Sequence, residues 1–231
     1  MSKRTRLYVG LTVVSGIALL VGCVASEFAT RHSGEYLVYC LLACFASAMK
    51  VQLPGIKGTI SANFLFILIA VALFTFAETV CLAAAACIVQ CLWRPKSRPR
   101  LVQVCFNVAA LAVSSGASYR ISHLFVGPAA GNVFLLLAIA VSLYFFADTL
   151  LVSGVLSLVQ TKSLLDVWRQ CYLWSFPYYL AGAAVAGLVL AASRAAGWGP
   201  SLLVLPLMAL VFAFYRIVAG RMESESVGGA A

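Results

Sequence analysis

Asp148, Glu78 and Arg120 are charged residues that interrupt long apolar runs, where they could do chemistry that their apolar neighbours cannot. Asp148 lies mid-run in LYFFADTLLVSG, Glu78 interrupts the apolar stretch that ends at Trp93, and Arg120 lies near the end of a third run. An ionisable group inside a bilayer costs several kcal/mol unless it is paired. We therefore take Asp148, Glu78 and Arg120 as candidate ligand-binding residues.

Each candidate also has a purely structural interpretation. Glu78 and Arg120 both fall near the outer ends of their predicted spans, so the sequence predicts an ion pair between them, which would bind a ligand or simply fasten two helices. Asp148 would either contact a ligand or form a buried hydrogen bond to Ser114 or Ser115.

Further polar and aromatic residues extend this set. Asn107 belongs to a group near the inner face that would contact a ligand or join helices by hydrogen bonds. Trp174 and Tyr178 flank Pro177 in the run WSFPYY, and we predict a hinge at Pro177 with a stacking wall for a flat ligand. The alternative for these aromatic residues is an interfacial belt.

The sequence lacks the patterns that catalysis would need. It contains no GxxxxGK[ST], HExxH or GxSxG motif, only two His, and seven acidic residues without a clustered pair. Its eight cysteines lie in or beside apolar runs and are expected to be buried packing residues. We expect no enzyme activity, no metal site and no cofactor.

Composition places these residues in a membrane. The 231-residue chain is 63% hydrophobic and 10% charged, whereas a soluble domain carries about 25% charged residues. Spanning helices need roughly 20 residues each, so we predict an all-α, polytopic transmembrane helix bundle of about eight spans, with six to eight as the range. Residues 1–221 would form one transmembrane domain and residues 222–231 a disordered tail.

The apolar runs give approximate bounds for the spans. They are Leu7–Ala25, Tyr36–Met49, Ala62–Phe76, Thr79–Trp93, Leu101–Phe125, Val133–Val159, Tyr172–Ala192 and Ser201–Val218. The third and fourth are short and meet at Ala77-Glu78, so they form either a steep helical hairpin or a partly re-entrant segment. The first span has an alternative as a lipoprotein signal ending at Cys23.

The basic residues predict the orientation. All but Arg31, Arg120 and Arg194 of the 16 Lys and Arg fall on one side of this layout. The positive-inside rule makes that side cytoplasmic, with both termini there. The same rule accounts for the net charge of +9 without a nucleic-acid partner.

Several short motifs, in a fixed order, carry a resemblance to a known family. They are KVQLPG at 50–55, TIS at 59–61, QCLWR at 90–94, WSFPYY at 174–179 and LVLP at 203–206. In this order they resemble the membrane-associated sensor region (MASE type) that precedes HD-GYP phosphodiesterase or GGDEF diguanylate cyclase domains in bacteria. The resemblance extends from about Glu35 to Arg221.

The resemblance implies a non-catalytic sensory or ligand-binding module of the bacterial inner membrane, linked to cyclic-di-GMP signalling. Beyond Arg221 the chain ends in MESESVGGAA, so catalysis is not implied, and a stand-alone sensor, a truncated sensor and a relative with another task remain open. Its partners would be the bilayer, a small or membrane-soluble ligand, and a homodimer or signalling partner.

Two other functions fit the same composition. One is a small-molecule uptake component resembling the substrate-binding subunit of an energy-coupling-factor transporter, which relies on a partner ATPase. The other is an assembly protein that uses the small residues of the seventh span, at Gly182, Ala183, Ala186 and Gly187, as a contact face.

Overall fold

A computed structural model describes residues 2–25, 33–52, 59–61, 63–93, 99–127 and 132–196. The predicted span Ser201–Val218, the predicted C-terminal tail and the side chains of Trp174 and Arg194 lie outside this description. The described elements, in order, are α1 (Lys3–Ala25), α2 (Ser33–Ala48), β1 (Lys50–Gln52), β2 (Thr59–Ser61), α3 (Asn63–Leu73), α4 (Phe76–Leu92), α5 (Leu101–Val126), α6 (Val133–Gln160), α7 (Leu164–Cys171), the 3₁₀ helix η1 (Leu173–Ser175) and α8 (Phe176–Ala196).

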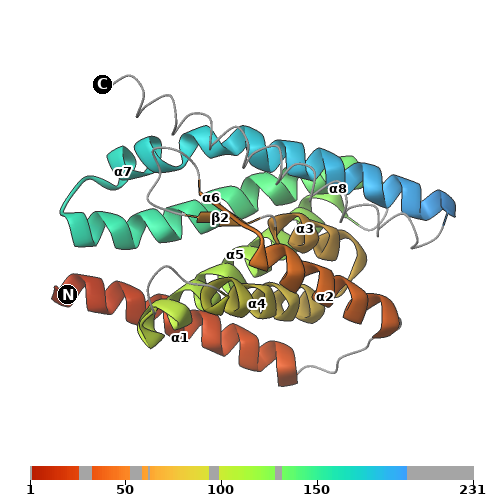
Figure 1. Cartoon of the computed structure of the whole chain (residues 1–231). Helices are drawn as coiled ribbons and strands as arrows, with labels where there is room; N and C mark the ends of the chain where they lie inside the picture. Colours follow the sequence, from red (N-terminus) through yellow and green to blue (C-terminus); the bar gives the residue numbers. More distant parts are fainter. Residues whose placement is uncertain are drawn as a thin grey trace, which may run out of the picture.

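The long helices run side by side along one direction of an elongated bundle (Figure 1). Four of the described helices are long and apolar enough to cross a membrane: Lys3–Ala25, Leu101–Val126, Val133–Gln160 and Phe176–Ser193. Many of their large apolar side chains, such as Leu11 on α1 and Leu188 on α8, are exposed. The helical membrane bundle that composition predicts is therefore confirmed, while eight spans stay a prediction.

The start of α1 and the end of α6 lie at the same end of the bundle (Figure 1). The Thr5 hydroxyl donates to the carbonyl of Leu158 at 3.5 Å, and the Tyr8 hydroxyl donates to the carbonyl of Leu151 at 3.1 Å. This agrees with the predicted layout, which places the basic start of the chain and Lys162 on one side.

The short helix α3 occupies the centre. Nine of its 11 residues are buried, and it packs against α2, α4, α6 and α8. At 1.5 Å per residue it rises about 16 Å, roughly half of a bilayer's apolar thickness. Unlike the four long helices, α3 cannot cross a membrane by itself.

An antiparallel pair of strands leads into α3. Lys50 pairs with Ser61 and Gln52 with Thr59, where the sequence analysis expects only a turn. The ladder supplies hydrogen-bond partners for backbone groups that belong to no helix. The turn predicted at Leu53-Pro54-Gly55 lies outside the described residues.

The boundary between α3 and α4 differs from the prediction. The helical conformation is interrupted at Phe74-Thr75 rather than at Ala77-Glu78. The Thr75 hydroxyl accepts the Glu78 amide at 3.4 Å, and the Glu78 carboxylate accepts the Thr75 amide at 2.8 Å. This capping box starts α4. Glu78 therefore lies in the first turn of a helix.

The seventh predicted span also begins later than expected. Between the predicted spans Val133–Val159 and Tyr172–Ala192 the chain forms α7, whose N-cap Ser163 accepts the Asp166 amide. η1 follows, and Pro177 is the second residue of α8. A proline in the first turn removes no helical hydrogen bond. Pro177 therefore does not kink the interior of a helix, and its role as a hinge stays a prediction.

The small residues of α8 pack inside the chain. A Cβ at Gly182 would collide with the Phe64 ring of α3, and one at Gly187 would collide with the Phe134 ring of α6. Ala183 and Ala186 are buried. This face is occupied within the protomer, which leaves it unavailable for the predicted assembly role.

Candidate functional site

Asp148 lies 15 residues into α6, about 22 Å along a helix about 42 Å long. Its carboxylate acts electrostatically on Tyr144, Tyr179 and Cys87. Tyr144 precedes it by one helical turn on α6, while Tyr179 comes from α8 and Cys87 from α4. Asp148 therefore faces the interior of the bundle, between α4 and α8.

Aromatic rings pack around Tyr144 and Tyr179, the two tyrosines that interact electrostatically with Asp148. The Tyr144 and Tyr179 ring centroids are 6.2 Å apart with an interplanar angle of 42°. Phe64 of α3 lies 4.7 Å from Tyr179 and Phe145 lies 5.2 Å from it on another side. Tyr144 and Tyr179 are 2% and 9% exposed, so the two rings are fixed by packing.

The polar groups of Asp148, Tyr144 and Tyr179 do not form hydrogen bonds with one another. Within the described part of the chain, neither the Asp148 carboxyl nor the Tyr144 or Tyr179 hydroxyl takes part in a hydrogen bond, and no ion pair involves Asp148. Asp148 is half-buried, whereas its neighbour Thr149 is 1% exposed. We call Asp148, Tyr144, Tyr179 and Phe64 the carboxylate–aromatic site.

The hydrogen bond predicted from Asp148 to Ser114 or Ser115 is not formed. The Ser115 hydroxyl donates to the carbonyl of Ala112 at 3.1 Å. The Ser114 hydroxyl is buried and lacks any partner in the described residues. The structural interpretation of Asp148 therefore loses the two partners that the sequence offered.

The site is joined to the helix at the end of the bundle. Trp168 of α7 donates its indole N–H to the Thr149 hydroxyl at 2.9 Å. Its ring also stacks on Phe146 at 5.8 Å and 28°. Because Thr149 follows Asp148 directly, this hydrogen bond connects the part of α6 that carries the site to α7.

Glu78 and Arg120 do not form the predicted ion pair. The Glu78 carboxylate is 4% exposed and bound within its own capping box. The Arg120 guanidinium carbon lies 4.3 Å from the centroid of the Phe76 ring, a cation–π contact. Each charge already has a partner of its own.

These two residues also lie apart from the carboxylate–aromatic site along α4. Glu78 is in the first turn, and Cys87 comes nine residues later, about 13 Å further along the axis. Sequence reasoning grouped all three charged residues, and the fold separates Asp148 from the other two.

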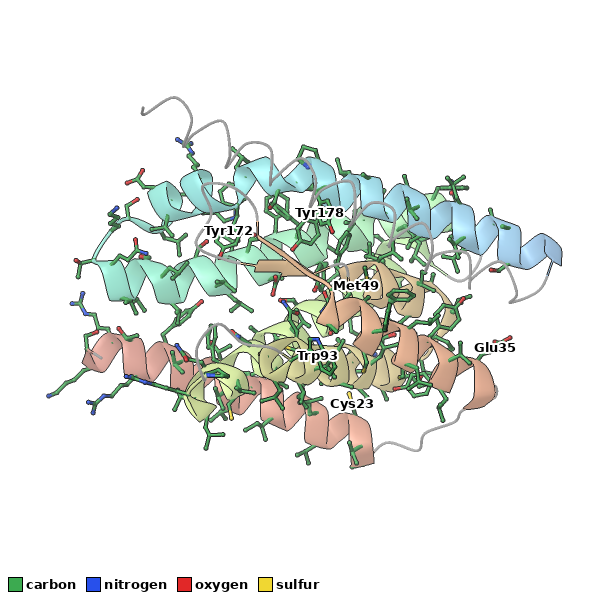
Figure 2. All side chains as sticks on the ribbon, in the orientation of Figure 1. Cys23, Glu35, Met49, Trp93, Tyr172 and Tyr178 are labelled. Carbon is green, nitrogen blue, oxygen red and sulfur yellow. The ribbon has the colours of Figure 1, made fainter. Side chains whose placement is uncertain are left out.

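The other predicted site residues lie at the edges. The Asn107 amide donates to the Cys91 sulfur at 3.6 Å, and Cys91 is a thiol one helical turn from the thiol of Cys87. Tyr178 projects from α8 (Figure 2), is 39% exposed, and has its ring 5.2 Å from Phe64. Tyr178 thus borders the site through its ring contacts with Phe64 and Tyr179, and Asn107 contacts Cys91 on α4.

Several site residues escaped the sequence analysis. Tyr144 could have been found, because it stands four residues before Asp148 and so shares its helical face. Tyr179 was seen only as part of an aromatic run, and Cys87 only as a packing thiol. No group of three His, Cys, Asp or Glu side chains in the described ranges could hold a metal ion.

The fold and this site describe a helical membrane protein in which, among the described residues, the Asp148 carboxyl has neither a hydrogen bond nor an ion pair. Comparison with protein-family models, with curated proteins and with solved structures found no match.

Proposed function

We propose that this chain is a non-catalytic sensory module of a bacterial inner membrane, which binds a small ligand at the carboxylate–aromatic site. One observation carries the proposal: the Asp148 carboxyl lies inside the bundle beside Tyr144 and Tyr179, with no hydrogen bond or ion pair from the described residues. A charge in this position costs several kcal/mol, and a bound ligand would offset that cost.

The chemistry of the site favours binding over mere packing. A half-buried carboxylate and two tyrosine hydroxyls would hold the polar end of a ligand, and the rings of Tyr144, Tyr179 and Phe64 would hold its apolar part. Binding sites typically combine apolar walls with a few polar groups in this way.

The link to α7 favours a sensor. A ligand that contacts Asp148 would shift α6 between two conformations, and the Thr149–Trp168 hydrogen bond would carry that shift to α7. The predicted topology puts α7 at the cytoplasmic side, where the MASE-type resemblance would place a signalling partner. Cyclic-di-GMP signalling is the output that this resemblance favours.

Native mass spectrometry of the protein in lipid nanodiscs tests ligand binding. We expect the wild-type protein to retain a small molecule and the Asp148→Asn variant to lose it. Asp166→Asn is the matched control, because Asp166 is an exposed acidic residue in the first turn of α7. Equal retention by wild type and Asp148→Asn would contradict the site, and no retained molecule in either would contradict ligand binding.

The Trp168→Phe variant separates sensing from binding. Phenylalanine keeps an aromatic ring against Phe146 but cannot donate to Thr149. We expect ligand retention within about twofold of wild type, because the site itself is intact. Hydrogen exchange of α7 should respond to ligand in the wild type and lose that response in the variant. An unchanged response would show that this hydrogen bond does not couple ligand binding to α7.

A further inference from the structure

We infer that the ligand of the carboxylate–aromatic site is an organic ammonium ion, which places its positive nitrogen beside Asp148 and against the faces of Tyr144 and Tyr179. The inference rests on the proposed function, since it names the chemical class of that ligand. It follows from the charge balance of the site and from the orientation of its rings.

The charge of Asp148 is not balanced within the described part of the chain. An ionised carboxylate accepts hydrogen bonds and donates none, so its complement must donate or carry positive charge. Arg120 of α5, which the sequence offers as a cation within an apolar run, lies over the Phe76 ring instead. Leaving a carboxylate unpaired in the interior is more costly than pairing it, which favours a ligand that supplies the cation.

The rings around Asp148 favour the same group. Tyr144 and Tyr179 lie 6.2 Å apart at 42°, and Phe64 lies 4.7 Å from Tyr179 at 43°. The face of an aromatic ring carries partial negative charge, and these three rings form one packed group beside Asp148, which follows Tyr144 by one turn of α6. A cation within about 6 Å of an aromatic centroid is attracted to that face. One carboxylate beside several such faces is a site for an ammonium group.

The same chemistry argues against neutral ligands that only accept hydrogen bonds. A quinone would direct carbonyl oxygens at a carboxylate, and two acceptors repel each other. A neutral apolar molecule would gain from the Tyr179 and Phe64 rings but would leave Asp148 unpaired. The site therefore discriminates by charge as well as by shape.

A pair of isosteric probes tests the charge directly. Choline carries a quaternary nitrogen. Its neutral isostere, 3,3-dimethylbutan-1-ol (here dimethylbutanol), has a carbon atom in place of that nitrogen, so the two molecules share a shape and differ in charge. We expect choline to raise the thermal unfolding midpoint of the full chain in nanodiscs at a concentration about tenfold lower than dimethylbutanol. The Asp166→Asn control should behave as the wild type.

Variants locate the preference at the site. Asp148→Asn keeps the shape of the side chain but removes its charge, so the tenfold preference for choline should disappear. Asp148→Glu keeps the charge and should keep part of the preference, which guards against loss through misfolding. Tyr179→Leu removes one ring and should weaken choline more than dimethylbutanol.

The outcomes separate this inference from the proposed function. Equal responses to both probes, or a choline preference that survives in Asp148→Asn, would overturn the ammonium ligand. If neither probe acts while nanodisc samples still retain a molecule that Asp148→Asn loses, the ammonium class fails and ligand binding stands. If neither probe acts and no molecule is retained, both fail together.

Discussion

Asp148 and the pair Glu78 and Arg120 make an instructive comparison, because all three charges occur in apolar helices. The Glu78 carboxylate completes the capping box with Thr75, and Arg120 lies over Phe76. Asp148 is half-buried in α6 and has no hydrogen bond or ion pair from the described residues. A charge inside an apolar helix is thus not by itself evidence for a ligand. What distinguishes a site is a charge that the fold leaves without a partner.

The largest effect should come from breaking the packing that positions the carboxylate–aromatic site. Gly182 lets α8 approach the Phe64 ring of α3, so Gly182→Val should destabilise the protein by about 3 kcal/mol through overpacking. Unfolding in detergent would measure this. Ala184→Val, at an exposed position of the same helix, is the control and should change stability by less than about 0.5 kcal/mol.

Opposite responses of Glu78 and Asp148 would sharpen the comparison most directly. Glu78→Ala should cost about 1–2 kcal/mol because the amide of Thr75 loses its partner. Ligand retention should stay near wild type. Asp148→Asn should cost no stability in the absence of ligand, since it removes an unpaired charge, yet abolish retention. A loss of stability in Asp148→Asn equal to that in Glu78→Ala would indicate a partner for Asp148.

The smallest effect concerns the predicted Glu78–Arg120 ion pair. In the structure Glu78 instead contacts Thr75 and Arg120 contacts Phe76. Arg120→Met should cost about 0.5–1 kcal/mol, which is the cation–π contact with Phe76 at an exposed position. A double-mutant cycle with Glu78→Gln tests the separation. Independent contacts predict additive losses, and a coupling energy of about 1 kcal/mol or more would restore the ion pair.

Sequence reasoning was most successful where one helix carries the information. The bounds of α1, α5 and α6 fall within about four residues of the predicted spans, because about 20 consecutive apolar residues leave few alternatives in a bilayer. It failed at the α3–α4 boundary, where Glu78 looked like an interruption and is instead the third residue of a helix. The Thr75 capping pattern was present in the sequence and could have corrected this.

The candidate site was only half visible in the sequence. Asp148 could be singled out, and Tyr144 lies on its helical face, because both facts are local to α6. Tyr179 and Phe64 are 31 and 84 residues away in the chain, so their place beside Asp148 depends on how α8 and α3 pack. The partners first considered for Asp148, Ser114 and Ser115, are as close in sequence as Tyr179 but are not bonded to it.

The sequence by itself determined that this chain forms apolar helices and that very few charges enter them, since both follow from composition and the cost of exposing backbone or charge to lipid. Only the tertiary structure decided which of those charged side chains have a hydrogen-bond or cation–π partner. Glu78 and Arg120 have partners among nearby residues, whereas Asp148 has no hydrogen bond or ion pair from the described residues. Partnering depends on distances between helices, and those are set by side-chain packing rather than by order along the chain.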